Sequence, residues 1–446
     1  MIVFTNNITA RLRYILDFVG GHITGTQIQI TEDPEYFNQF EGPKINYGNK
    51  SICESEFRIA NSPLLFENTV HHQAVECFVA TRPGGHVYKA FFATEGDFPF
   101  DIFAASFYLI TRYEEYLPHQ KDEYGRYSHK NSIAFKEGFL DLPLVNIWLQ
   151  DFQESLKKKF PQLAVRGSSF TFIPTYDIDE AYAYANKQWW RTAGGLIKSV
   201  VSGRWSKLAE RVSVLLKKEK DPYDAFEWMD KLNSSHGLRP LYFFLVAGST
   251  AGYDKNILPT TTAMGELIRH HAVLYSIGIH PSWKSGGNAN ELRLEILCLG
   301  RLTGKPIRSS RQHYLRFTLP GTFRQLIDAG IESEFSMGYG TINGFRASVA
   351  SPFYWYDLER EAETKLMIYP FCFMDANAFY EEKLSPEAAA DELSHYFRII
   401  KSVNGMLITI WHNNFLGTDK LFARWRDVYQ DFLSSLEISA SPAAEI

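Results

Sequence analysis

Short apolar runs alternate with segments of helical periodicity from about residue 168 to the end of the chain. Each run has four to seven residues and is too short for a helix of ordinary length. Strands that alternate with helices form parallel βα units, and about seven of them favour a closed α/β barrel over an open sheet. The expected strands are Phe170–Thr175, Leu241–Val246, Val273–Ile279, Pro306–Ser309, Ile331–Phe335, Leu366–Phe371 and Met406–Trp411.

Polar side chains that could act as catalysts or metal ligands follow four of these runs. In a parallel α/β fold the chemistry lies at the carboxyl ends of the strands, so residues directly after the runs are the ones to inspect. They are Asp177 and Asp179 after the first run, His280 after the third, Arg311 and His313 after the fourth, and His412 after the last. Each is a weak signal alone, but random scatter would rarely place all of them at strand ends. We therefore interpret them as one site.

Asp177 and Asp179 stand two residues apart and can face the same cavity. Their like charges would raise one pKa unless a cation lies between them. A metal ion meets this need, with one carboxylate as a ligand and the other free as a base. The alternative interpretation is structural, with the two carboxylates in a simple loop or helix cap and the lone histidines in packing roles.

In this order, the residues resemble the polysaccharide deacetylase family (chitin/peptidoglycan N-deacetylase-like). Thr175-Tyr-Asp-Ile-Asp179 is similar to the family's Thr-Phe-Asp-Asp motif with one inserted residue, and His280 to the first histidine of its second motif. Arg311-Gln-His-Tyr314 resembles the third motif, and the run ending at His412 resembles the fifth. The segment Gly338–Arg346 resembles a feature of a divergent bacterial branch of this family. The chain resembles a member of that branch with an extra N-terminal domain.

The resemblance implies a distorted (β/α)7 barrel over residues 166–446, preceded by a smaller α/β domain over residues 1–165. It implies that Asp177 is the general base and that Asp179 and His280 bind a divalent metal, zinc being the first choice. It also implies that His412 protonates the leaving amine. Arg311 would hold Asp177 ionised or orient it.

Besides the residue inserted in the first motif, a second position departs from the family pattern. Lys284 stands four residues after His280, where the second metal histidine is expected, and a protonated lysine is not a usual ligand. Because catalytic zinc normally has three protein ligands, we expect His313 to supply the third from a neighbouring strand end. The alternative is that His313 lines the sugar cleft without touching metal.

The implied activity is metal-dependent removal of an acetyl group from an N-acetylated sugar or polysaccharide, in surface-polysaccharide biosynthesis. Trp411, Arg346 and Tyr314 are assigned to substrate binding. Two alternatives stay open, since a fold does not fix a function. One is a catalytically inactive glycan-binding barrel that has lost its metal, and the other is a different C–N hydrolase on the same scaffold.

The first 165 residues carry no catalytic constellation. Helical spacing predicts one helix over 100–116, with Asp101 near its start, and another over 144–160. The cluster of Arg112, Glu114 and Glu115 is expected to be a solvated helix face.

A basic insertion is expected at about residues 186–225. Between Lys187 and Lys220 there are nine lysine and arginine residues against two glutamates, interleaved with aromatic and aliphatic residues. This pattern suits an amphipathic hairpin on an anionic membrane surface, or one that meets an anionic lipid-linked sugar. The alternative is an ordinary exposed helical pair packed on the barrel.

Charge and hydropathy limit the partners. The net charge of −5 gives no global basic field, which argues against nucleic acid as a partner. The N-terminus lacks the pattern of a signal peptide, and no run reaches the roughly 18 apolar residues of a membrane span. We expect a cytoplasmic protein that acts on an N-acetylated glycan or lipid-linked sugar, in association with the inner membrane face through residues 186–225.

Overall fold

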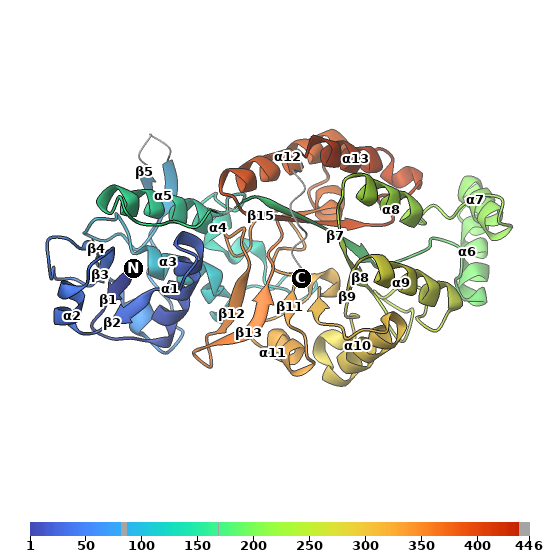
Figure 1. The fold of residues 1–446 in the computed structure, drawn as a ribbon. Helices are drawn as coiled ribbons and strands as arrows, with labels where there is room; N and C mark the ends of the chain where they lie inside the picture. Colours follow the sequence, from blue (N-terminus) through green and yellow to red (C-terminus); the bar gives the residue numbers. More distant parts are fainter. Residues whose placement is uncertain (82–86, 168, 437–446) are drawn as a thin grey trace.

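The computed structural model describes residues 1–81, 87–167 and 169–436 (Figure 1). An N-terminal part carries a small parallel sheet in the order β2-β1-β3-β4 and an antiparallel pair, β5 and β6. The strands are β1 (Ile2–Phe4), β2 (Gln29–Thr31), β3 (Lys44–Tyr47), β4 (Phe57–Ile59), β5 (Phe78–Thr81) and β6 (Val87–Ala90). The helices are α1 (Ala10–Ile23), α2 (Pro34–Gln39), α3 (Ile102–Ile110), α4 (Ile133–Lys136) and α5 (Leu144–Lys159).

The helix expected over 100–116 is shorter in the structure. Asp101 caps α3 by accepting a hydrogen bond from the backbone N–H of Ala104 at 3.0 Å. The helix ends at Ile110, because Arg112 adopts a left-handed backbone with φ of 56° and a separate 3₁₀ turn follows over Tyr113–Tyr116. The helix expected over 144–160 is confirmed as α5.

The rest of the chain is built on one large sheet in the order β12-β13-β11-β10-β9-β8-β7-β15-β14. Every neighbouring pair is parallel except β12 with β13. The strands are β7 (Thr171–Ile178), β8 (Leu241–Phe244), β9 (Ser276–Ile279), β10 (Ser309–Ser310), β11 (Ser333–Glu334), β12 (Phe353–Asp357), β13 (Ala362–Ile368), β14 (Phe373–Met374) and β15 (Met406–His412).

The sheet corrects two expectations. Within the described residues, β14 and β12 are edges that do not pair with each other, so the sheet is not a closed barrel. The run expected from Val273 begins as a strand only at Ser276, because Val273 belongs to the last turn of α9. The strands β12 and β14 were not expected from the sequence.

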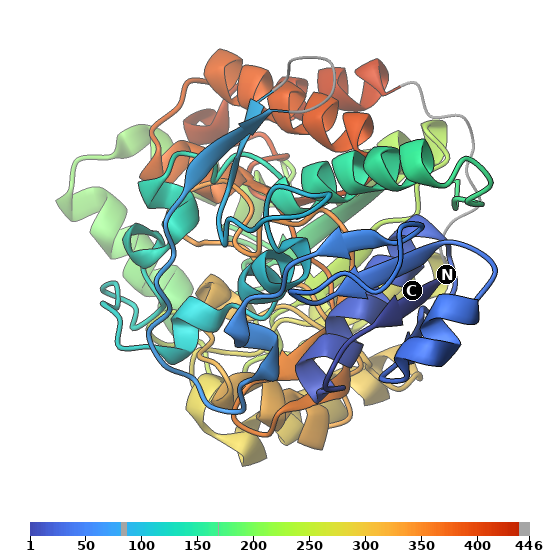
Figure 2. The same cartoon turned by 90° about the vertical axis from the view of Figure 1, so that its left-hand side faces the viewer.

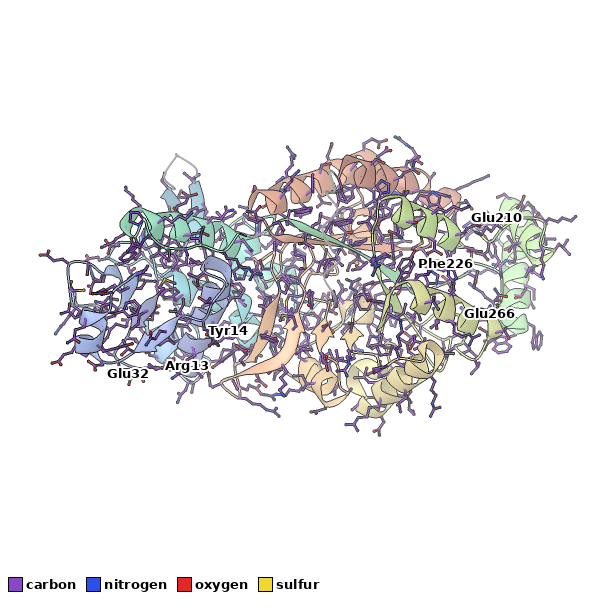
Figure 3. The ribbon with its side chains drawn as sticks, in the orientation of Figure 1. Arg13, Tyr14, Glu32, Glu210, Phe226 and Glu266 are labelled. Atoms are coloured by element: carbon purple, nitrogen blue, oxygen red, sulfur yellow. The ribbon has the colours of Figure 1, made fainter. Side chains whose placement is uncertain are left out.

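Helices cover the large sheet, as Figure 1 shows for α12 and α13 above it, for α10 and α11 below it, and for α9 beside β8 and β9. The six covering helices are α8 (Phe226–Ser235), α9 (Thr262–Leu274), α10 (Ala289–Thr303), α11 (Gly321–Asp328), α12 (Pro386–Ser402) and α13 (Trp425–Ser435). The basic insertion forms α6 (Trp189–Val201) and α7 (Trp205–Leu215) at one end of the molecule. In Figure 3, Glu210 marks this end and Glu32 marks the opposite, N-terminal end.

The N-terminal part and the large sheet are joined by shared packing and by buried ion pairs. A single cluster of buried apolar side chains includes residues from both. Arg346 donates two hydrogen bonds to the carboxylate of Glu115, at 2.8 and 2.6 Å, and Arg112 donates a third at 2.8 Å. Arg112, Glu115 and Arg346 are all buried, so the expectation of a solvated helix face is wrong. Arg112 and Glu115 are buried because the segment that contains Arg346 packs against them.

No helix among the described residues combines the length and the apolar character needed to cross a membrane. Figure 2 shows the molecule from its N-terminal end, with the helix pair α6 and α7 projecting beyond the outline of the other helices.

Candidate active site

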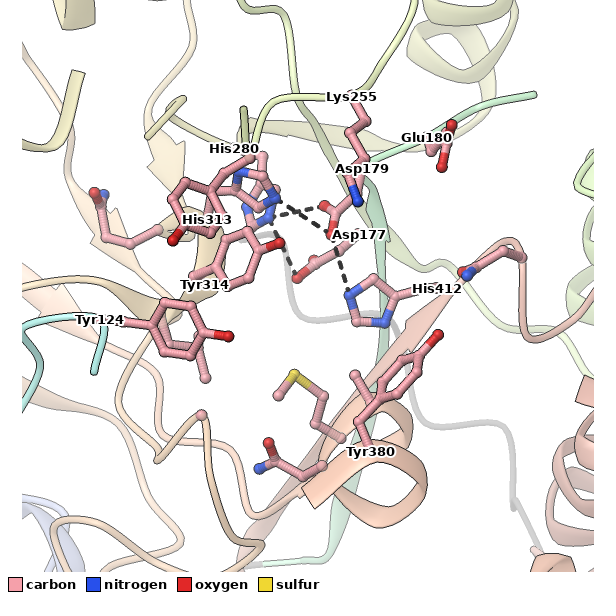
Figure 4. A pocket seen from close by; sticks show the side chains of 18 of the residues that line it. Tyr124, Asp177, Asp179, Glu180, Lys255, His280, His313, Tyr314, Tyr380 and His412 are labelled. Carbon is pink, nitrogen blue, oxygen red and sulfur yellow. Dashed lines mark ion pairs between the residues drawn. The ribbon is translucent and has the colours of Figure 1, made fainter. Parts of the chain in front are cut away.

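The two aspartates of the first expected motif lie at the carboxyl end of β7, an interior strand of the large sheet. Asp177 is in the strand and Asp179 follows its last residue. Asp177 pairs in register with His412 on the neighbouring strand β15. Because side chains two residues apart on a strand share a face, Asp177, Asp179 and His412 all point into one pocket, as Figure 4 shows.

His280 follows β9 and is fixed by the backbone of the next strand. Its Nδ1–H donates to the carbonyl oxygen of Arg311 at 2.5 Å. Its Nε2 lies 3.0 Å from Oδ1 of Asp179. The carbonyl therefore holds the imidazole with Nε2 facing Asp179.

His313 lies in a 3₁₀ turn after β10 and reaches the same carboxylate from the side. Its Nδ1 lies 3.1 Å from Oδ1 of Asp254 and its Nε2 lies 3.5 Å from Oδ2 of Asp179. Burial by itself lowers the pKa of His313, but the charge of Asp179 and hydrogen bonds with Asp179 and Asp254 outweigh it and raise the pKa to about 9.

His412 is held by a carboxylate that sequence reasoning missed. Its backbone N–H donates to Oδ2 of Asp375 at 2.7 Å, and its Nδ1 lies 2.6 Å from Oδ1. The Nε2 atom lies 3.5 Å from Oδ2 of Asp179. Burial lowers the pKa of His412, but the charges of Asp375 and Asp179 prevail and raise it to about 10.

Asp375 and Asp254 complete the site from segments that were not assigned any role. Asp375 follows the two-residue strand β14, at the end of the apolar run Phe371-Cys-Phe-Met. That run ends in a carboxylate at a strand exit, which is the signal that could have found it. Asp254 lies in the loop after β8, where no periodicity marks it.

Arg311 holds Asp177 in place. Its Nη1 donates to Oδ1 of Asp177 at 2.7 Å and to Oγ1 of Thr175 at 2.8 Å, and both charged groups are buried. The guanidinium stacks 4.4 Å from the ring centre of Phe243. Burial lowers the pKa of Arg311, and the charge of Asp177 and its hydrogen bond oppose this shift.

The donor set fits a divalent metal. One ligand atom each from Asp179, His280 and His313 lies within 4.8 Å of the others. Oδ1 of Asp179 is buried and accepts no hydrogen bond among the described residues, so it is available as a ligand. One carboxylate oxygen and two imidazole nitrogens suit zinc, and also cobalt, iron or manganese. Although burial favours the protonated form, the charges of His313 and His280 hold the pKa of Asp179 well below its usual range.

Lys284 does not take the place of a ligand. Its side chain is exposed and donates to Oγ of Ser249 at 3.1 Å. The group that could hold a metal takes its third candidate donor atom from His313, so it needs no donor from position 284.

The pocket has a volume of about 550 Å³ and includes residues from both parts of the molecule. Tyr314, which was assigned to substrate binding, lines it, and Tyr124 and Arg126 reach it from the N-terminal part. Arg126 donates to the carbonyl oxygen of Tyr314 at 2.6 Å and so ties the N-terminal loop to the pocket wall.

Two residues assigned to substrate lie elsewhere. Trp411 is fully buried, with its ring centre 4.7 Å from that of Tyr429. Adjacent residues on a strand point to opposite faces, so the position that turns His412 into the pocket turns Trp411 toward α13. Arg346 is buried in its ion pair with Glu115. We no longer expect either side chain to contact a substrate.

Comparisons with known proteins give limited likeness. Residues 1–161 match a family of unknown function (DUF7033), and no curated protein is matched by the sequence. Proteins assigned as polysaccharide deacetylases from Mycobacterium smegmatis and Pseudomonas aeruginosa PAO1 are 13% and 12% identical in sequence. Each superposition covers 60% of this chain and 86% or 84% of the other, with TM-scores of 0.38 and 0.39. A polysaccharide deacetylase from Bacillus cereus is 10% identical in sequence. Its superposition covers 59% of this chain and 87% of the other, with a TM-score of 0.30.

Proposed function

We propose that this protein is a metal-dependent hydrolase that removes an acetyl group from an N-acetylated sugar or glycan. One observation carries the proposal: the Nε2 atoms of His280, His313 and His412 all converge on the carboxylate of Asp179, within 3.0 to 3.5 Å. Asp177 lies beside them with a buried arginine partner. Amide hydrolysis needs an electrophilic centre, a base and an acid at one place, and these residues provide all three roles.

Asp179, His280 and His313 would hold the metal. A divalent ion bound there would supply a Lewis acid that polarises the acetamide carbonyl and lowers the pKa of a water molecule. Three protein ligands leave a coordination position open, as catalytic zinc sites require.

Asp177 is suited to act as the general base. Arg311 occupies its Oδ1, and Oδ2 accepts no hydrogen bond from another side chain among the described residues. The buried guanidinium fixes the orientation of the carboxylate. Asp177 can therefore receive a proton from the attacking water through Oδ2.

His412 is suited to act as the general acid. With a pKa raised to about 10, its imidazole is protonated at neutral pH. Asp375 binds Nδ1, so the proton on Nε2 faces the pocket. The leaving nitrogen of an amide must be protonated before it departs, and Nε2 is placed to deliver that proton.

An aromatic wall supports a sugar substrate. Tyr124, Tyr253, Tyr314 and Tyr380 line the pocket. Their rings offer apolar faces for the C–H faces of a sugar, and their hydroxyls offer hydrogen bonds.

The direct test measures acetate released from soluble N-acetylated oligosaccharides by the zinc-reconstituted protein. We expect release by wild type and a loss of about 10²–10⁴-fold in Asp177→Asn, which keeps the shape of the side chain but cannot act as a base. The control is Asp328→Asn, at an exposed position on α11 outside the pocket. Equal activity in Asp177→Asn and wild type would refute the assignment of the base.

A further inference from the structure

The helix pair α6 and α7 leaves most of its surface in water. Ser199 and Val214 are the two buried residues of these helices. The pair lies at the end of the molecule opposite the N-terminal sheet, where no other described element covers its outer side (Figures 1 and 2).

Large apolar side chains gather on this exposed pair. Among the described residues, nine of the 21 exposed large apolar side chains lie between Trp189 and Leu216. Trp189 and Val201 are 79% and 82% exposed. On each helix the residues follow the same helical spacing, seven and then four residues apart, so each helix has an apolar stripe. The stripes are Trp190, Ile197 and Val201 on α6, and Trp205, Val212 and Leu216 at α7 and its C-terminal end.

Cations border these stripes. The segment 187–220 carries nine lysine and arginine residues against two glutamates, in a chain whose net charge is −5. A helix with exposed tryptophan on one face and basic residues beside it is the kind that lies in the interface of an anionic membrane. A second copy of this chain is disfavoured as the occupant, because it would bring two strongly cationic surfaces together.

Beneath the pair lies a cavity of about 230 Å³ with cationic walls. None of its four cations forms an ion pair with a carboxylate among the described residues, and Nε of Arg211 is buried without a hydrogen-bond partner. The four cations are Lys198, Arg204, Lys207 and Arg211. None of the residues of the apolar stripes lines this cavity.

The two carboxylates in the cavity wall are engaged elsewhere. Glu180 pairs with Lys187 at 2.5 Å, and Asp419 accepts a hydrogen bond from the backbone N–H of Leu421 at 2.9 Å. The cavity thus has an excess of positive charge, which a phosphate group would balance through charge-assisted hydrogen bonds.

The cavity adjoins the active site. Glu180 and Tyr223 line both the cavity and the pocket that contains Asp179. Arg191 of α6 also donates to the carbonyl oxygen of Lys255, which lines that pocket, at 3.1 Å. A phosphate bound in the cavity would therefore lie in a space that adjoins the pocket of Asp179.

We propose that the outer face of the α6–α7 pair docks on an anionic membrane, and that the cavity beneath it binds the phosphate of a lipid anchor. Its substrate would then be a sugar carried on a lipid phosphate. That the substrate carries an N-acetylated sugar rests on the proposed function, whereas the docking on a membrane does not.

Vesicle co-sedimentation tests the docking. We expect wild type to bind vesicles of phosphatidylcholine with phosphatidylglycerol and to leave vesicles of phosphatidylcholine alone in solution. The variant Trp190→Ser/Ile197→Ser/Val201→Ser should bind about tenfold more weakly or worse. The matched control is Val273→Ser/Leu294→Ser/Leu297→Ser, which removes three exposed apolar side chains from α9 and α10 and should bind like wild type.

Titration with inorganic diphosphate tests the cavity without a membrane. Wild type should bind it, and Lys198→Glu/Lys207→Glu should lose about tenfold or more in affinity. The charge control is Lys157→Glu/Lys158→Glu on α5, which should bind like wild type.

Three outcomes would overturn the inference: no preference for the anionic vesicles, unchanged vesicle binding by the α6 variant, or unchanged diphosphate binding by the cavity variant. A self-association that the α6 variant abolishes, without vesicle binding, would assign the face to a second copy and also overturn it. Neither assay contains an N-acetylated substrate, so both report binding without turnover. If wild type released no acetate from soluble substrate, the proposed function would be refuted, but the results of the vesicle and diphosphate assays would be unaffected.

Discussion

Asp375 binds His412 at two points, through the backbone N–H at 2.7 Å and through ring Nδ1 at 2.6 Å. A single buried carboxylate thus fixes both the main chain and the ring orientation of the proposed general acid. The pairing joins two neighbouring parallel strands, β14 and β15, at their carboxyl ends. We infer that Asp375 is a positioning residue for His412.

Asp375→Asn should lower kcat about 10–100-fold with little change in KM or in metal content, because an amide offers one acceptor where the carboxylate offers two. Steady-state kinetics and elemental analysis measure this. The control is Asp141→Asn, since Asp141 pairs with His395 at 3.0 Å on the surface outside the pocket. A variant with unchanged kcat would contradict the role of Asp375.

Asp254→Ala should weaken metal binding about 10–100-fold, because it removes the acceptor that orients His313. Asp254→Asn should retain most of the affinity. The same oxygen, Oδ1, accepts from both His313 and the backbone N–H of Trp283, and an asparagine oxygen can do so too. Competition with a chelator measures the affinity. Equal losses in the two variants would point to charge instead of orientation.

Tyr124→Ala should raise KM for an oligosaccharide about 2–10-fold with a small effect on kcat, as expected for the loss of one aromatic contact. Its ring centre lies 5.3 Å from that of Tyr314 in the pocket. Tyr36→Ala, at an exposed tyrosine of α2, is the control. An unchanged KM would contradict a role for Tyr124 in binding substrate.

Glu115→Gln should lower the free energy of unfolding at neutral pH by about 3–5 kcal/mol, because it leaves the charges of Arg112 and Arg346 buried without their partner. Burial by itself raises the pKa of Glu115, but the two arginines prevail and lower it to about 2. Chemical denaturation measures the loss, and Glu359→Gln, in a surface pair with Arg324, should cost about 1 kcal/mol or less.

The pH dependence follows from the same depressed pKa. The stabilisation by Glu115 is fully present above the unfolded value of 4.5 and is lost as pH falls toward about 2. Wild type should therefore lose more stability than Glu115→Gln over this range. Parallel pH curves for the two proteins would contradict the account.

Site residues that directly follow predicted strands could be predicted from the sequence. Features that depend on contacts between residues far apart in the chain could not. Asp179, His280 and His313 were found because each follows an apolar run, and the structure brings them together. Asp375 was missed because its strand, β14, has two residues and gives no periodicity. The prediction of a closed barrel was wrong. Closure would require the edge strands β12 and β14 to pair, and the order of strands along the sequence does not determine whether they do.

Arg346 shows the same limit. Its segment follows no strand pattern, and its partner Glu115 is 231 residues away in the sequence. Arg346, which was assigned to substrate binding, and Glu115, which was expected to be solvated, neutralise each other in a buried ion pair.

Metal content of the zinc-reconstituted protein, measured by elemental analysis for wild type, His313→Ala and His412→Ala, tests the central claim most directly. We predict about one metal per chain in wild type, loss of metal in His313→Ala, and retention in His412→Ala, because three protein ligands are needed and His412 is not one of them. Metal that stays in His313→Ala, or wild type that binds none, would contradict the proposed centre.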